Sequence, residues 1–230
     1  MLFGSCLVIA CASLIFTSCG RSGKGTRIFE RTDPADTKIS FSNDLVESDS
    51  LNILDYLYFY NGAGVAAADF NNDGLEDLYF VANQGANRLY LNKGGLQFED
   101  ITEKAGVRGS GSWKTGVTVV DINDDGFKDI YVSAVSGYKS FKGKNQLYIN
   151  NGDLTFTESA ARYGIDFEGL STQAAFFDYD KDGDLDLFVL THSVHSNDTY
   201  GDSTLRFRYS GPAGDHLFRN EGGVFKDVTQ

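Results

Sequence analysis

The sequence predicts an all-β chain made of about three β-propeller blades, each a four-stranded antiparallel sheet. An acidic nine-residue turn occurs three times, with apolar runs before and after each copy. A second motif, a strand running into an Asn/Gly turn, follows each copy. The first Asp of the acidic turn recurs at intervals of 52 and 57 residues. Four-stranded units that repeat at such a period are typical of propeller blades, which bury their faces only against neighbouring blades.

The acidic turns, at 69–77, 121–129 and 178–186, favour a hard cation. Each has an oxygen-bearing side chain at positions 1, 3, 5 and 9 and a glycine at position 6. Ca²⁺ takes about 6–8 oxygen ligands, and glycine permits the sharp turn around it. An EF-hand is excluded, because position 12 is Phe80, Val132 or Val189 instead of Glu. A plain Asx turn would explain one copy, but three copies with one spacing favour a metal site.

Composition places the negative charge in these turns. The chain of 230 residues has a net charge of −12, and the three turns hold 13 of its 32 acidic residues against two lysines. The rest of the chain is therefore close to neutral. Nucleic acid is not an expected partner, because phosphate binding requires a basic surface.

The N-terminus resembles a lipoprotein leader. Residues 1–19 are apolar and small and end at Cys19, and Phe16 to Cys19 resembles a bacterial lipobox in which the cysteine is lipidated. An ordinary cleaved signal peptide is the alternative, and Cys11 is a competing site. Residues 20–26 form a Gly/Ser/Lys tether. All three cysteines lie in the leader, so the remainder cannot form disulfides.

Residues 27–63 are expected to be an N-terminal strand segment. Alternating apolar residues, Ile39 and Phe41, predict one strand after a turn at Asp33-Pro34. The aromatic stretch 51–60 is expected to be a short helix or a strand. Its aromatic rings are expected to pack in a core, with stacking on a sugar as the alternative.

Three blades are expected to follow, at 64–107, 108–165 and 166–230. Each reads as first strand, acidic turn, second strand, loop, third strand, Gly turn and fourth strand. The third strands end at Asn92, Asn150 and Asn220, and the fourth strands begin at Phe98, Phe156 and Phe225.

The two motifs together resemble the FG-GAP/VCBS repeat, the propeller repeat of integrin α-subunits and many bacterial surface proteins. The resemblance covers 64–230, and its closest form is the bacterial branch often joined to an ASPIC/UnbV domain. It implies three Ca²⁺ sites, with backbone carbonyls donated at position 7. The ligands implied by position are Asp69, Asn71, Asp73, Leu75 and Asp77; Asp121, Asn123, Asp125, Phe127 and Asp129; and Asp178, Asp180, Asp182, Asp184 and Asp186.

Three blades are expected to be part of a seven-bladed propeller whose missing blades lie downstream. An open arc leaves apolar faces uncovered, so the chain alone is expected to self-associate.

The connection between the second and third strands carries all the variation in repeat length, and it is expected opposite the acidic turns. Per-repeat insertions on one face often bind ligands. The candidate ligand-binding residues in the longer connections are Tyr138, Lys142, Tyr200, Arg206 and Arg208. The alternative is that these loops only cover neighbouring blades.

The sequence thus predicts an exported cell-envelope lipoprotein, at the outer membrane or cell surface, with structural Ca²⁺ sites. It would bind an extracellular protein or glycan. The alternative is part of a propeller enzyme acting on polysaccharide. No nucleophile motif or zinc-spaced cluster is present, so no catalytic residue is assigned.

Overall fold

The computed structural model describes residues 29–194 and 213–229 and divides the chain into two units, 1–33 and 34–230. In the first unit, residues 29–33 are described and contain no helix or strand. All the elements below belong to the second unit. Within the described ranges, no helix has the length and apolar character needed to cross a membrane.

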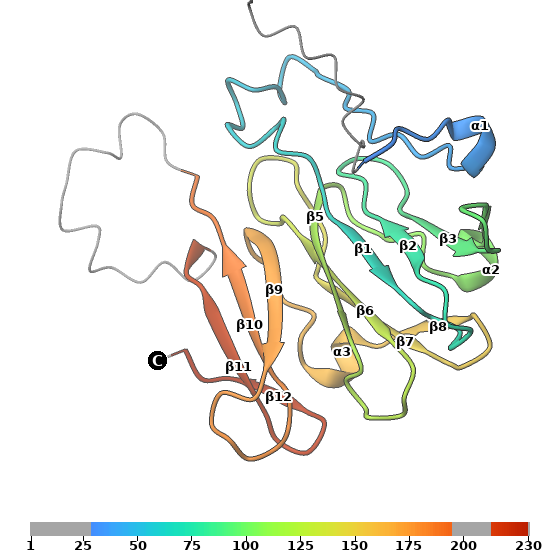
Figure 1. Cartoon of the computed structure of the whole chain (residues 1–230). Coiled ribbons are helices and arrows are strands. Elements are labelled where there is room, and N and C mark those ends of the chain that lie inside the picture. The colour runs from blue at the N-terminus through green and yellow to red at the C-terminus, as the bar shows by residue number, and fades with distance from the viewer. Residues whose placement is uncertain (1–28, 195–212, 230) are drawn as a thin grey trace, which may run out of the picture. The chain divides into compact units, whose positions relative to one another are not determined.

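The second unit contains three four-stranded antiparallel sheets, as the sequence predicts (Figure 1). Sheet 1 consists of β1 (Val65–Ala68), β2 (Asp77–Phe80), β3 (Arg88–Asn92) and β4 (Phe98–Asp100). Sheet 2 consists of β5 (Lys114–Val120), β6 (Asp129–Ala134), β7 (Gln146–Asn150) and β8 (Phe156–Glu158). Sheet 3 consists of β9 (Ser171–Phe177), β10 (Asp186–Thr191), β11 (His216–Asn220) and β12 (Phe225–Asp227). Strands that are consecutive in sequence are neighbours in every sheet, so each sheet is a meander of the kind that forms a propeller blade.

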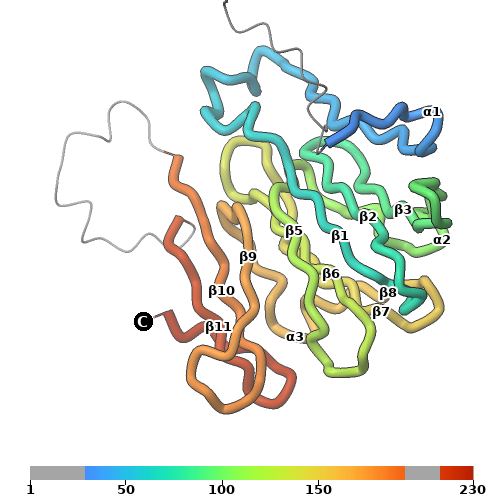
Figure 2. The backbone as a smooth tube through the Cα atoms, viewed as in Figure 1, coloured from blue at the N-terminus to red at the C-terminus, as the bar shows by residue number. Residues whose placement is uncertain are grey.

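The first strands of the sheets, β1, β5 and β9, lie side by side (Figure 2). One apolar core lies between sheets 1 and 2 and includes Phe70, Leu89 and Val132. A second core lies between sheets 2 and 3 and includes Tyr131 and Leu187. Each sheet therefore buries a face against the next sheet, which is how propeller blades are stabilised.

A one-turn helix follows the fourth strand in sheets 1 and 2, which the sequence analysis did not predict. These helices are α2 (Thr102–Ala105) and α3 (Ala160–Tyr163), and each ends at a glycine with a left-handed backbone. The next residue is buried, and its carbonyl accepts a bond from a tyrosine hydroxyl of the second strand. The pairs are Tyr79 with Val107 at 2.7 Å and Tyr131 with Ile165 at 2.9 Å. The helix thus returns the chain to the core before the next blade begins.

The strand expected within residues 28–43 is absent from the described residues, so this prediction is wrong. Residues 34–37 form α1 (Pro34–Thr37), and the chain then runs without strand pairing. The alternation that suggested a strand is real, because Ile39 and Phe41 are half-buried between exposed neighbours. Phe41 stacks on Phe80 at 4.9 Å. The segment therefore joins sheet 1 through side chains instead of a backbone ladder.

The aromatic stretch 51–60 is neither a helix nor a strand but a series of turns. Tyr56 and Phe59 are nevertheless buried, and they pack with Trp113 and Phe141 in a third apolar cluster. The prediction that aromatic rings of this stretch pack in a core is confirmed for these two residues.

Candidate functional site

The three acidic loops connect the first and second strands of their sheets, at the end where β1, β5 and β9 finish (Figure 1). Their backbone conformation repeats. Position 4 is left-handed in each loop, with φ of 57° at Asn72, 55° at Asp124 and 66° at Lys181. Position 6 is also left-handed, with φ between 85° and 98° in the three loops, and is always glycine.

The first Asp of each loop holds this turn closed. One carboxylate oxygen accepts the N–H of position 5, at 3.1, 3.1 and 3.2 Å in the three loops. The other accepts the N–H of the position 6 glycine, at 2.7, 3.0 and 3.2 Å. These residues are Asp69, Asp121 and Asp178. Their carboxylates therefore face into the loop, where a cation would lie.

The Asp at position 5 accepts the N–H of position 7, at 2.9 Å from Leu75, 2.8 Å from Phe127 and 2.9 Å from Asp184. In the first two loops its other oxygen accepts the amide of the position 3 Asn. The pairs are Asn71 with Asp73 at 2.9 Å and Asn123 with Asp125 at 2.8 Å.

The third loop differs, because position 3 is Asp180 and a carboxylate cannot donate this bond. Partial desolvation and the charges of Asp182, Asp186 and Asp178 raise the pKa of Asp180. Oxygens of Asp178, Asp180 and Asp186 lie within 4.8 Å of one another, the one such acidic group in the described residues. This loop therefore has the most carboxylates at the expected ligand positions.

The Asp at position 9 is fully buried in each loop and anchors it to the sheet. One oxygen accepts the N–H of position 2, at 3.1, 3.0 and 3.0 Å. The other accepts the N–H of an asparagine on the third strand, at 2.7, 2.8 and 2.8 Å. These residues are Asp77, Asp129 and Asp186. Burial, opposed by these two hydrogen bonds and reinforced by Asp125 and Asp121, raises the pKa of Asp129 to about 6.

The partner asparagines were part of the second motif, but sequence reasoning gave them no role. Each one also donates its side-chain amide to the carbonyl of position 8, at 2.9, 3.2 and 3.2 Å. Its side-chain oxygen accepts a glycine N–H of the Asn/Gly turn, at 2.9, 3.0 and 2.7 Å. They are Asn92, Asn150 and Asn220. Their constant distance from the Gly turn was the signal that could have identified them.

This donor set fits a hard cation. In the first two loops, positions 1, 3 and 5 provide two carboxylates and an amide within one turn. In the third loop they provide three carboxylates. The position 9 carboxylate lies at the end of the turn in each loop. Carboxylate oxygens accept more than one bond each, so those that bind N–H groups retain lone pairs for a metal. Oxygen ligands in an irregular loop suit Ca²⁺ better than Mg²⁺, which requires near-octahedral geometry.

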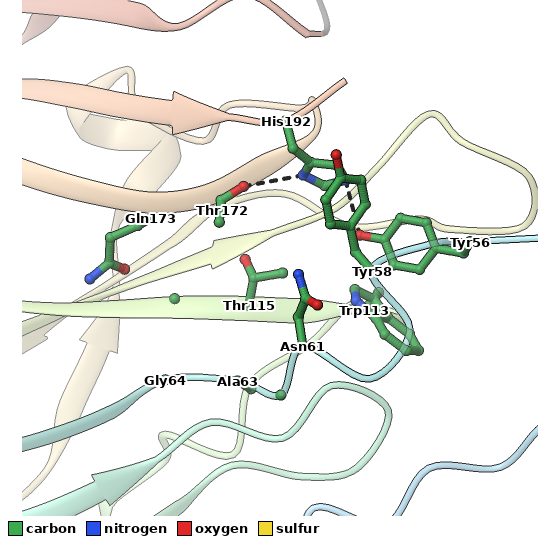
Figure 3. Close-up of a pocket in the computed structure, with 12 residues that line it drawn as sticks. Tyr56, Tyr58, Asn61, Ala63, Gly64, Trp113, Thr115, Thr172, Gln173 and His192 are labelled. Carbon is green, nitrogen blue, oxygen red and sulfur yellow. Dashed lines mark hydrogen bonds between the residues drawn. The ribbon is translucent and has the colours of Figure 1, made fainter. Parts of the chain in front are cut away.

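A pocket of about 440 Å³ lies at the opposite end of the first strands (Figure 3). It is lined by residues 61–64, by the beginnings of β5 and β9, and by the aromatic side chains of Tyr56, Tyr58 and Trp113 with His192. The connections between second and third strands also lie at this end, because Phe80 of β2 pairs with Val65 of β1.

His192 is held on both sides of its ring. Its Nε2 shares a hydrogen bond of 3.0 Å with the Tyr56 hydroxyl, and its Nδ1 shares one of 3.2 Å with the Thr172 hydroxyl (Figure 3). Burial lowers the pKa of His192. The imidazole is therefore neutral near pH 7, with a hydrogen bond at each ring nitrogen.

Of the candidate ligand-binding residues, two lie in the described part of the chain. Tyr138 is half-buried in the third apolar cluster and donates its hydroxyl to the carbonyl of Asp55 at 2.7 Å. The Lys142 side chain is exposed. Neither lines the pocket. Tyr200, Arg206 and Arg208 lie outside the described residues, as does Cys19.

Comparison with known proteins gives one family. The profile of the FG-GAP-like repeat matches residues 69–132 and 134–189, just over half of the chain. Integrin alpha-3 of Cricetulus griseus is 32% identical over 145 residues, which cover 56% of this chain and 13% of the length of the integrin. Cartilage acidic protein 1 of Xenopus tropicalis is 26% identical over 164 residues, which cover 70% of this chain and 22% of the length of that protein. Human cartilage acidic protein 1 is 31% identical over 138 residues, which cover 57% of this chain and 20% of the length of the human protein. The chain thus spans less than a quarter of the length of these relatives.

Proposed function

Because the chain belongs to the FG-GAP-like repeat family, we propose that it is a calcium-stabilised propeller module that binds an extracellular protein or glycan. The observation that carries this proposal is the acidic loop, which is built three times with the same hydrogen bonds at the same end of the sheets. A loop conserved in geometry through three repeats points to a common ligand, and its donors are those of Ca²⁺.

Calcium in this proposal has a structural role. The carboxylates of each loop repel one another and one of them is buried, so a cation in the loop favours the folded state. We expect three Ca²⁺ ions per chain, with side-chain ligands from positions 1, 3, 5 and 9 and the carbonyl of position 7.

Thermal unfolding of the full chain, in excess chelator and in Ca²⁺, tests the metal part. We expect Tm to rise with Ca²⁺ concentration, because a ligand that binds only the folded state stabilises it by mass action. Mg²⁺ at the same concentration is the control and should raise Tm less. A Tm that does not change between chelator and Ca²⁺ would contradict the proposal.

The third loop should bind Ca²⁺ most tightly, since Asp180 adds a carboxylate where the other loops have Asn. Asp180→Asn gives this loop the ligand set of the first two and should weaken one of the three sites. Asn123→Ala, which removes an amide ligand from the second loop, is the comparison. Calcium affinities of the third site that agree before and after Asp180→Asn would contradict this ranking.

The binding function is supported by the relatives, which include integrin alpha-3, and by the pocket at the end opposite the acidic loops. We propose a non-enzymatic module. Both ring nitrogens of His192 in the pocket wall are engaged, by Tyr56 and Thr172, which leaves this imidazole poorly placed as a general base.

The module is proposed to be tethered to the cell envelope through lipidated Cys19. Cys19→Ala should move the protein from the membrane fraction to the soluble fraction. Mass spectrometry of the mature N-terminus is the direct measurement. A mature N-terminus at any other residue would exclude this attachment.

A further inference from the structure

We propose that the pocket at the start of the first strands binds a neutral saccharide unit. This inference rests on the proposed function, because it assigns a ligand class and a site to the binding module. It concerns residues that the metal loops do not use.

The repeat itself forms the floor of the pocket. Ala63, Thr115 and Thr172 occupy one repeat position, just before or at the start of β1, β5 and β9. The next position is glycine in the first two repeats and Gln173 in the third. The third repeat thus places a long amide side chain at the position where the other two repeats have no side chain.

The two glycines are required by close approach. A Cβ on Gly116 would lie 1.9 Å from the Gln173 side-chain oxygen and 2.5 Å from the Thr172 carbonyl. The Gln173 amide nitrogen donates to the Val117 carbonyl at 3.2 Å. The side chain of Gln173 is therefore fixed across β5, with its oxygen above Gly116.

The chemistry of the lining excludes strong binding of ions. None of the described residues that line it is Asp, Glu, Lys or Arg, although charged residues make up 23% of the chain. Burial lowers the pKa of His192, so the imidazole also carries no charge near pH 7. An ionic ligand would lose hydration here without gaining a counter-charge.

The remaining donors and acceptors suit hydroxyl groups. The exposed Asn61 side chain makes no hydrogen bond to another described residue, and it points into the space between Thr115 and His192 (Figure 3). Gln173 also lines the pocket, with its amide oxygen close to Gly116 of the neighbouring strand. An amide and a carbonyl oxygen can pair with the alternating donors and acceptors of adjacent sugar hydroxyls.

The apolar component is a group of rings on one side. Tyr58 is half-buried, its ring centroid is 4.4 Å from that of His192, and its hydroxyl donates to the Ser193 carbonyl at 3.3 Å. Tyr56 and Trp113 pack behind it with centroids 5.5 Å apart. The Tyr58 ring, held in place, matches the C–H face of a pyranose, and the Asn61 amide beside it matches the hydroxyl edge. The volume of about 440 Å³ is within the ~300–1,000 Å³ of small-molecule sites.

The test uses Trp113, the one tryptophan in the chain, as a built-in fluorescent reporter. The full chain in Ca²⁺ is titrated with glucose, galactose, mannose, N-acetylglucosamine and their neutral disaccharides. Saturation-transfer NMR on the same samples reports binding independently of the fluorophore. We expect at least one of these sugars to bind and to change Trp113 emission saturably.

Matched variants locate the binding. Tyr58→Ala and Asn61→Ala should each weaken binding of that sugar at least tenfold. Tyr60→Ala and Gln97→Ala change an exposed tyrosine and an exposed glutamine outside the pocket, and they should leave binding unchanged. Gln173→Ala changes the opposite wall of the pocket. Its Tm in Ca²⁺ is measured to check that this variant remains folded.

Glucuronic acid and an arginine-containing peptide are titrated in parallel. Binding of either one in the pocket without binding of a neutral sugar would overturn the ligand class but leave the binding module standing. Absence of binding by every neutral sugar would overturn the inference. The rise of Tm with Ca²⁺ is measured separately, so a failure of the metal sites is distinguished from a failure of the pocket.

Discussion

The backbone N–H of Asn92 donates to the buried carboxylate of Asp77 at 2.7 Å, and this bond joins the end of the third strand to the end of the acidic loop. The same pair recurs as Asn150 with Asp129 and Asn220 with Asp186, both at 2.8 Å. Each pair links the two motifs of the repeat. The Asn/Gly turn is thus part of the framework that holds the acidic loop.

Asn150→Ala is expected to destabilise the chain more than a change of an exposed turn asparagine. Its amide donates to the Lys128 carbonyl and, across the sheet interface, to the buried Phe70 carbonyl at 2.8 Å. Removing it leaves these carbonyls without that donor, at a cost of about 2–3 kcal/mol. Urea unfolding in Ca²⁺ measures the difference.

The control is Asn151→Ala, one residue further along in the exposed turn. It should change the free energy of unfolding by less than about 1 kcal/mol. Equal destabilisation by the two variants would show that the Asn150 contacts have no special weight.

Gly116→Ala tests the close packing of β5 against β9. Its Cβ would lie 2.5 Å from the Thr172 carbonyl, so the strands must separate. Such overpacking is expected to cost about 1–3 kcal/mol in unfolding experiments. At Gly85 an added Cβ has its nearest neighbour at 3.5 Å, and Gly85→Ala should be close to neutral. A Gly116→Ala variant as stable as Gly85→Ala would argue against this approach of the strands.

Lys114 predicts a pH dependence. It is 2% exposed, its ammonium donates to the Gly85 carbonyl at 2.9 Å, and burial lowers its pKa from 10.5 to about 8. Below pH 8 the lysine is charged in both the folded and unfolded states, so the cost of burying the charge is fully present. Between pH 8 and 10.5 only the unfolded state holds the proton, and the cost fades as pH rises.

Lys114→Met is therefore expected to stabilise the chain at pH 7, by up to about 3 kcal/mol less the lost hydrogen bond. The gain should shrink as pH rises from 8 to 10. Lys93→Met, at an exposed lysine, should not change the pH profile. Denaturation curves at each pH provide the measurement, and parallel profiles of wild type and Lys114→Met would contradict the assignment.

The strands and acidic loops could be predicted because each is encoded locally. The apolar runs around Asp69, Asp121 and Asp178 determine the first and second strands, and the repeated spacing of Asp and Gly determines the shared loop conformation. The segment around Phe41 was misassigned for a physical reason. Burial alternates along strands, and it also alternates along extended segments that pack only through side chains. The apolar pattern of the sequence does not show whether the backbone pairs with another strand.

The pocket could not be predicted from the sequence. Tyr56 and His192 are 136 positions apart, and their contact depends on how three sheets pack together. The role of Asn92, Asn150 and Asn220 was missed for the opposite reason. An Asn close to a Gly is already explained as a turn residue, so its constant distance from the Gly turn was not taken as a sign of bonds to the acidic loop.

Calcium stoichiometry is the most direct test of the central claim that each of the three loops is a metal site. The chelated full chain is titrated with Ca²⁺ by calorimetry, and bound metal is counted by elemental analysis. We expect three ions per chain, falling to two when Asp121→Ala removes the first ligand of one loop. No bound calcium, or an unchanged count in Asp121→Ala, would contradict it.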